Sequence, residues 1–279
     1  RFKGKIPLLN LAADFTRPET KSTKGAYVGF EIEAQTAEKL RDLAGKKDAT
    51  MFMAALTLFN ILLFKLTTQE DIIIGTVTAG RRQRDLENIV GMFINTLPLR
   101  NFPQGKKSFI DFLEEIRETT LEAFDNEDYQ FEDLVEKVLE KRDPTRNPLF
   151  DVLFAYGQLD LVDIRQEVSD YAAQPGKPGA AEPGQDVLRV EPYNREGAVS
   201  KFDMIFSGTD DGEKLFFSIN YCTAIFKEET ARRWAKYFAE IATAAAENEQ
   251  VLLKDITISH DLVTATSEVY RDQESDFEF

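Results

Sequence analysis

DIIIGTVTAGRRQRDLENIVGMFINTLPLR, residues 71–100, is the stretch that decides the fold. Its apolar opening leaves no polar face and predicts a buried strand over Asp71–Val77. Thr78–Gly80 break that strand into a basic loop, Arg81–Arg84. After a short turn, Gly91 is expected to open a second strand that continues through Leu99. A rigid sheet often holds out a functional loop in this way, and the same spacing also fits a plain solvated crossover.

Composition places the chain among soluble globular proteins with a sizeable core. Of its 279 residues, 43% are hydrophobic and 30% are charged, and its 22 phenylalanines fall mostly within periodic segments, where they are expected to fill the core. The formal net charge of -15 argues against non-specific binding to nucleic acid or to an anionic membrane. The composition therefore predicts neither of these two partners.

The single cysteine, Cys222, excludes an internal disulfide and gives no sign of an oxidising compartment, so we expect a cytoplasmic protein. Cys222 is expected to be a small buried side chain at the end of a strand. The most apolar run, Met51–Leu66, is too short to span a bilayer and predicts a core helix. No signal peptide is visible, and a start at Arg1 is expected of a piece cut from a longer chain.

Strand and helix patterns alternate along the chain and predict an α/β fold, a two-layer sandwich with a mixed sheet flanked by helices. Strands are expected over residues 27–33, 149–156, 187–190, 201–207 and 215–221, the last two joined by an Asp211-Gly212 hairpin turn. Helices are expected after the caps Thr36 and Thr50, from Ser108 to Phe124, and over Phe131–Leu139 and Lys227–Glu247.

Three segments carry little periodicity. Residues 1–25 predict a strap on the surface, and residues 259–279 are polar and acidic, which is typical of a linker. Residues 160–186 include YAAQPGKPGAAEPGQ, a Pro-, Gly- and Ala-rich run that predicts a flexible loop or insertion.

The residues alone do not make a complete catalytic constellation. The only histidine, His260, lies in the expected linker, so most zinc sites and a Ser-His-Asp triad are disfavoured, and no metal site is expected. No Gly-rich phosphate loop is present. Two polar clusters remain, near strand ends, where arginines either bind a phosphate or pin loops through carboxylates. Their members are Arg81, Arg82, Arg84, Asn95 and Arg100 in the first, and Arg142, Asp143, Arg146 and Asn147 in the second.

These clusters resemble the later motifs of nonribosomal peptide synthetase condensation domains. The family's Gly-Arg loop and Gly-x-Phe-Val-Asn-Thr motif stand here as Gly80-Arg81 and Gly91–Thr96, closed by Arg100. Two further motifs follow in order, as Asp128–Val135 and as Arg-Asp-x-x-Arg-Asn-Pro-Leu-Phe over Arg142–Phe150. Further similarity lies at Pro7–Leu11, Lys201–Asp203 and Ile219–Tyr221, so the resemblance runs from about Ile6 to Ile258.

The family's catalytic motif, His-His-x-x-x-Asp-Gly, is absent from this sequence. The resemblance therefore implies the C-terminal lobe alone, over residues 1–258, followed by the start of a linker to an adenylation domain. Such a lobe has the chloramphenicol acetyltransferase fold and pairs with an N-terminal lobe around a tunnel. Donor and acceptor carrier proteins bring thioesters into that tunnel on phosphopantetheine arms, and an amide forms in the course of antibiotic biosynthesis. No cofactor is expected to bind the lobe directly.

The resemblance also implies residue roles. The loop Gly80–Gly91 would form part of the tunnel floor, and the stretch after Tyr156 would include a latch to the other lobe. No catalytic residue is expected in this chain. The residues expected to face the tunnel or the phosphopantetheine are Ala79, Gly80, Arg81, Asn95 and Arg100. Those expected to be structural are Gly91, Phe93, Arg142, Asp143, Arg146 and Asn147.

Two alternatives stay open from the sequence. A carrier-protein docking or scaffold module would share these motifs without performing chemistry. A lobe of an epimerisation or heterocyclisation domain would share the architecture, although the adenylation-type linker disfavours it.

Overall fold

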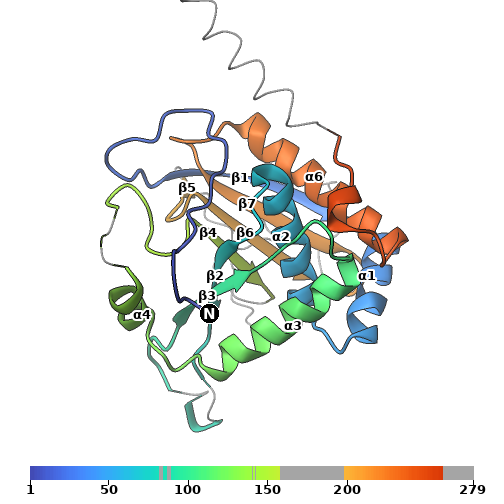
Figure 1. The fold of residues 1–279 in the computed structure, drawn as a ribbon, viewed down its shortest axis with the longest axis horizontal. Coiled ribbons are helices and arrows are strands. Elements are labelled where there is room, and N and C mark those ends of the chain that lie inside the picture. The colour runs from blue at the N-terminus through green and yellow to red at the C-terminus, as the bar shows by residue number, and fades with distance from the viewer. Residues whose placement is uncertain (82–83, 87–88, 140, 142, 158–197, 260–279) are drawn as a thin grey trace, which may run out of the picture.

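A computed structural model describes residues 1–81, 84–86, 89–139, 141, 143–157 and 198–259, and its framework is a seven-stranded sheet (Figure 1). The strands are β1 (Lys24–Ile32), β2 (Ile72–Thr78), β3 (Asn95–Asn101), β4 (Val152–Tyr156), β5 (Ala198–Val199), β6 (Met204–Asp210) and β7 (Leu215–Cys222). Their order is β3-β2-β4-β6-β7-β1-β5. The β2–β4 and β4–β6 pairs are parallel and the rest are antiparallel, so the expected mixed sheet is confirmed.

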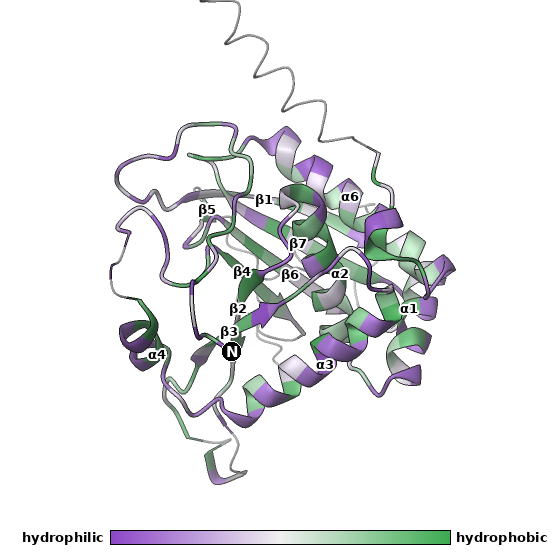
Figure 2. Ribbon diagram, viewed as in Figure 1, coloured by the Kyte–Doolittle hydropathy of each residue, from purple (hydrophilic) through white to green (hydrophobic). Residues whose placement is uncertain are grey.

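Within the described residues, four helices bury one face of this sheet. They are α1 (Ala34–Lys46), α2 (Met51–Thr67), α3 (Phe109–Asp125) and α6 (Glu228–Glu247). Because side chains alternate along a strand, Ile72 and Ile74 enter this core while Ile73 faces the other side. Phenylalanine rings pack between the sheet and the helices. The Phe206 ring centroid lies 4.6 Å from that of Phe59 on α2 and 4.7 Å from that of Phe238 on α6. Figure 2 shows α3 and α6 alternating between hydrophobic and hydrophilic along their length, as such packing requires.

A smaller apolar cluster lies on the opposite side of β2. Its buried members are Ile73, Val135, Leu149 and Phe150, and the helix α4 (Phe131–Val138) supplies one of them. The strap packs Phe2 and Ile6 against the same cluster. The strap has no helix or strand up to β1, and it lies beside α4 and the turn before β4 (Figure 1).

Several boundaries differ from the sequence expectation. The second strand of the opening stretch begins at Asn95 and not at Gly91, because residues 91–94 belong to a loop folded around Arg81. The strand expected from Leu149 begins at Val152, because Leu149 has a left-handed φ of 67° and the Phe150 N–H turns back to the Pro148 carbonyl.

Two further boundaries shift for comparable reasons. The strand expected from Lys201 begins at Met204, because the hydroxyl of Ser200 donates to the carbonyl of Phe202 and holds these residues in a bend. Helix α1 begins at Ala34 after Glu33, so Thr36 is not its cap.

Other local expectations are confirmed. The Thr50 and Ser108 hydroxyls accept the backbone N–H groups of Met53 and Asp111 at 3.3 and 3.2 Å and so cap α2 and α3. Strands β6 and β7 form the expected hairpin, and Cys222 is buried. The expected strand over 187–190, the loop over 160–186, His260 and the linker beyond it lie outside the described residues.

Each helix of the described residues is either too short or too polar to span a bilayer by itself. No single helix among them is both long and apolar enough to cross a membrane, although α1 and α2, bent by 108° at their junction, meet the length and composition criteria as a pair.

Candidate functional site

The loop between β2 and β3 is organised from within by Arg81. The Arg81 guanidinium donates to the backbone carbonyls of Leu86, Ile89 and Gly91, the last two at 2.9 and 3.1 Å. It also lies over the Phe93 ring, 4.4 Å from the ring centroid. Gly80 has a φ of 62°, and a Cβ there would overlap the Phe93 carbonyl oxygen. The structure therefore brings together Gly80, Arg81, Gly91 and Phe93 as parts of one folded loop.

The tip of this loop exposes apolar side chains to solvent. Val90 and Met92 are 101% and 90% exposed, and Ile89 and Ile94 are about half exposed. Ala79, at the start of the loop, is exposed as well. Apolar side chains gathered in this way usually mark a surface that another molecule covers.

Asn95 lies at the junction of this loop with β3 and is buried. Its amide nitrogen donates to the carbonyls of Glu127 and Tyr129 at 2.6 and 2.9 Å, and its oxygen accepts the Thr96 N–H at 2.8 Å. The side-chain hydroxyl of Thr78 donates to the Glu127 carboxylate nearby. Asn95 thus ties the turn after α3 to the base of the β2–β3 loop.

Arg100 lies at the other end of β3 and binds the beginning of the chain. Its guanidinium forms a two-pronged pair with Asp71, Nε to Oδ1 at 2.8 Å and Nη2 to Oδ2 at 2.7 Å. Its remaining donors reach the backbone carbonyls of Arg1 and Lys5 at 3.0 and 3.1 Å. The hydrogen bonds with Asp71 raise the pKa of Arg100 further, so the group stays charged. Through these contacts Arg100 holds the start of the chain against β3. Its expected position beside the tunnel stays a prediction.

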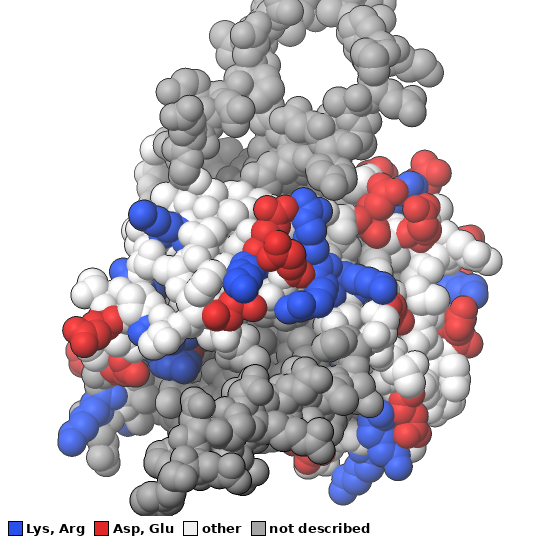
Figure 3. Space-filling view, turned by 90° about the horizontal axis from the view of Figure 1, so that it is seen from above, with Lys and Arg blue, Asp and Glu red and all other residues white. Residues whose placement is uncertain are grey.

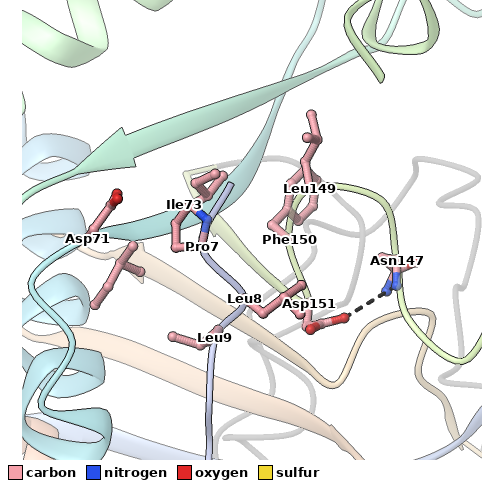
Figure 4. Close-up of a pocket in the computed structure, with 10 residues that line it drawn as sticks. Pro7, Leu8, Leu9, Asp71, Ile73, Asn147, Leu149, Phe150 and Asp151 are labelled. Carbon is pink, nitrogen blue, oxygen red and sulfur yellow. Dashed lines mark hydrogen bonds between the residues drawn. The ribbon is translucent and has the colours of Figure 1, made fainter. Parts of the chain in front are cut away.

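The second motif cluster also turns toward the strap. Arg146 pairs with the buried Asp151 and reaches the Leu9 carbonyl at 3.4 Å. Asn147 accepts from the Lys21 ammonium and donates to the Lys201 carbonyl at 3.3 Å. Figure 4 shows the strap, from Pro7 to Leu9, passing this turn, with the Asn147–Asp151 hydrogen bond drawn as a dashed line.

Asp143 acts within its own turn, and Arg142 lies outside the described residues. The Asp143 carboxylate accepts the Thr145 hydroxyl at 2.6 Å and the Thr145 N–H at 2.8 Å. Both hydrogen bonds lower the pKa of Asp143 below its usual value. The residue is exposed, so this is a local turn lock of the kind that Asp commonly forms.

The strap itself contributes partners that the sequence did not predict. Arg17 forms a two-pronged pair with Asp203, with Nη1 to Oδ1 at 2.9 Å. Burial, together with the charge of Asp203, raises the pKa of Asp151, and burial lowers the pKa of Lys21. The strap sequence has no hydrophobic periodicity, so its path could not be predicted from a pattern. The only sequence signal for these contacts is charge, because the strap carries lysines and arginines and two acidic residues precede strands.

A groove of about 320 Å³ follows the free edge of β3, between α3 and α4. Apolar side chains form its floor, and Arg1 and Glu122 pair across its rim at 2.6 Å. Elsewhere, Figure 3 shows acidic and basic side chains intermixed over one face of the described residues.

Comparison with models of known protein families shows the family of this chain. The model of the family described as "Condensation domain" matches residues 1–266. The chain belongs to the condensation-domain family. Bacitracin synthase 3 of Bacillus licheniformis is 39% identical to this condensation domain over 86% of the chain, and surfactin synthase subunit 2 of Bacillus subtilis (strain 168) is 38% identical over 95%. The chain spans only 4% and 7% of the length of these two relatives.

Solved structures support the fold of this condensation domain. A four-domain nonribosomal peptide synthetase bound to AMP and glycine superposes with a TM-score of 0.77 and 24% identity, covering 91% of this chain and 19% of that one. The X-domain from teicoplanin biosynthesis superposes with a TM-score of 0.75 and 22% identity, covering 92% and 55%. The expected chloramphenicol acetyltransferase-like architecture of the condensation domain is thereby confirmed.

Proposed function

We propose that this chain is the C-terminal lobe of a condensation domain that joins two carrier-bound aminoacyl or peptidyl thioesters through an amide bond. The observation that carries the proposal is the family match over residues 1–266 in a sequence without the His-His-x-x-x-Asp-Gly motif. The relatives are named as synthases of bacitracin and surfactin, which supports a role in peptide antibiotic biosynthesis.

In the proposed reaction the acceptor amine attacks the donor thioester carbonyl. A C–N bond forms, the C–S bond breaks, and the donor phosphopantetheine leaves as a thiol. The amine proton is taken up with the help of a histidine in the N-terminal lobe. The present chain contributes part of the tunnel floor, formed by the Gly80–Gly91 segment of the β2–β3 loop, and no catalytic base of its own.

The exposed apolar tip of that loop is our proposed contact with the N-terminal lobe. Val90 and Met92 project from a loop whose base is fixed by Arg81 and Asn95, so the tip is presented in a defined position. Burial of two such side chains would contribute roughly 3–6 kcal/mol to lobe association before losses in motional freedom. Donor and acceptor carrier proteins are the proposed partners at the two tunnel mouths, with an adenylation domain following residue 258.

The test restores an N-terminal lobe that carries an intact His-His-x-x-x-Asp-Gly motif and supplies two loaded carrier proteins. Mass spectrometry of the acceptor carrier is expected to show the dipeptidyl thioester, whereas the isolated chain should give none. A matched domain with alanine for the second histidine of that motif is the control. Peptide-bond formation by the isolated chain, or none by the restored domain, would contradict the proposal.

The same experiment separates the docking-module alternative. A docking module would bind the carrier proteins, detected by a fluorescence anisotropy change, and yield no dipeptide even with the intact motif. An epimerised or heterocyclic product would instead assign the lobe to one of the related domain classes.

A further inference from the structure

Over residues 1–10, the backbone hydrogen bonds of the strap are made with side chains and not with a neighbouring strand. Gln69, just beyond α2, donates to the Leu8 carbonyl at 2.9 Å and accepts the Asn10 N–H at 2.7 Å. Arg100 and Arg146 bind three more strap carbonyls, those of Arg1, Lys5 and Leu9. An extended segment interrupted by Pro7 cannot join a regular ladder, so its polar groups need such partners.

The two arginines can hold the strap because each is itself held by a carboxylate. Arg100 engages Asp71 through Nε and Nη2, which leaves Nη1 and a second Nη2 hydrogen for the strap. Arg146 pairs with Asp151 through Nη1, and the same nitrogen reaches the strap. A guanidinium has five donors in a fixed plane and can bind a carboxylate and a backbone carbonyl at once, and a lysine would lose this geometry.

Contacts farther along the strap fix the rest of its path. Asp14 accepts the Lys227 N–H at 2.8 Å and the Thr230 hydroxyl at 3.0 Å, so it closes the N-terminus of α6. Arg17 engages Asp203 beside β6. The strap is thus bound at points contributed by β3, the end of α2, the turn before β4, β6 and α6.

Strand β3 connects this attachment to the tunnel loop. Asn95 at one end of β3 holds the base of the β2–β3 loop, and Arg100 near the other end holds the strap. The two residues are separated by a rigid length of strand, a distance of roughly 17 Å. A change in the path of the strap would therefore displace whatever precedes it relative to the loop.

We propose that Arg100 and Arg146 are positioning residues, which fix the strap and through it the orientation of the preceding lobe toward the tunnel loop. This inference rests on the proposed function. Neither side chain needs to contact substrate in this role. The ligand of both arginines is the backbone of the same chain, and their effect on turnover passes through lobe geometry.

The first arm of the test uses this chain as it stands. Limited trypsin digestion should cleave after Lys5, whose carbonyl Arg100 binds, at least tenfold faster in Arg100→Gln and in Gln69→Ala than in the wild type. Arg41→Gln is the matched control, since Arg41 forms the same two-pronged pair with Asp210, at 2.7 and 3.0 Å, on an element remote from these strap contacts. Gln69 lies outside the ion pairs, so its variant reports on the strap even if Arg100→Gln fails to fold. Unchanged cleavage after Lys5 would overturn the proposal.

The second arm uses the complete condensation domain with one spin label on each lobe. Arg100→Gln and Arg146→Gln are expected to broaden the inter-lobe distance distribution and to lower kcat at least tenfold, with KM for the acceptor carrier changed less than twofold. Arg41→Gln should change neither measurement. Faster cleavage after Lys5 with an unchanged distance distribution and unchanged kcat would overturn the proposal. A wild-type domain without turnover would contradict the proposed function instead, and the distance measurement would still decide the role of the arginines.

Discussion

Gly80 shows how one residue sets the shape of the candidate tunnel wall. Its φ of 62° is in the left-handed region, and the Phe93 carbonyl lies where a side chain would begin. The Gly80→Ala variant should therefore lose about 1–3 kcal/mol of unfolding free energy, measured by urea denaturation. Gly212→Ala is the matched control, because Gly212 has a φ of 93° but no described atom within 4 Å of the place that a methyl group would occupy. Equal losses in the two variants would contradict the steric part of this explanation.

Asp210 makes a pH-dependent contribution to stability. Its hydrogen bonds with Arg41 lower the pKa of Asp210 below the ordinary value of 3.8, so the folded state favours the ionised carboxylate. The resulting stabilisation is complete well above pH 3.8 and is lost as the pH falls through the lowered pKa.

Asp210→Asn should accordingly be about 1 kcal/mol less stable than the wild type at pH 6. That difference should shrink as the pH falls below 3.8 and through the lowered pKa of Asp210. Urea denaturation of both proteins at several pH values measures it, and all other titrating groups are common to both. A difference that stays constant across this range would contradict the assignment.

Most of these polar residues could be located from the sequence, but their partners could not. Arg100 and Arg146 were selected from motif spacing, and their charge was obvious. Their hydrogen-bond partners could not be predicted, since Arg100 binds carbonyls 95 and 99 residues away along the chain. A backbone carbonyl carries no sequence signature, so a strap held through its carbonyls is visible only after the chain has folded.

At the scale of the element, β3 is an edge strand that is protected against further pairing. Pro98 has no N–H to offer, and the Thr96 N–H is already bonded to the Asn95 side chain. Pro98→Val would restore a donor on the free edge beside the groove. With Val90 and Met92 replaced by serine in this variant and in its control, to remove the exposed apolar loop tip, we expect Pro98→Val to form concentration-dependent dimers in sedimentation velocity runs. Thr96→Val keeps the bonded N–H and adds similar apolar surface, so dimerisation of that control would show that hydrophobicity, and not the edge, is responsible.

Element identity was largely predictable because local patterns decide it. The isoleucine run indicated β2, the alternation before α1 indicated β1, and the caps Thr50 and Ser108 indicated the starts of two helices. Two of the boundaries that moved lie at Gly91 and Leu149, where long-range or turn-forming hydrogen bonds override the local preference for strand.

At the scale of the whole molecule, the exposed tip of the β2–β3 loop should govern solubility. We expect the isolated chain to self-associate through Val90 and Met92 despite its net charge of -15. Replacing both by serine should shift the sedimentation profile toward monomer while Tm stays within about 2 °C, because neither side chain is packed in the core. Persistent self-association in the double variant would show that a surface other than Val90 and Met92 mediates it.

The pairing of β1 with β7 has a consequence for synthesis. Tyr27 lies opposite Asn220, roughly 190 residues later in the chain. A ribosome adding ~5–20 residues per second would take roughly 10–40 s to supply that partner. During this time β1 has no neighbour for most of its length, and the apolar helix α2 lacks its cover from α6. The nascent polypeptide is therefore a natural client for a chaperone, and fragments that stop before Leu215 should accumulate as aggregates when they are expressed alone.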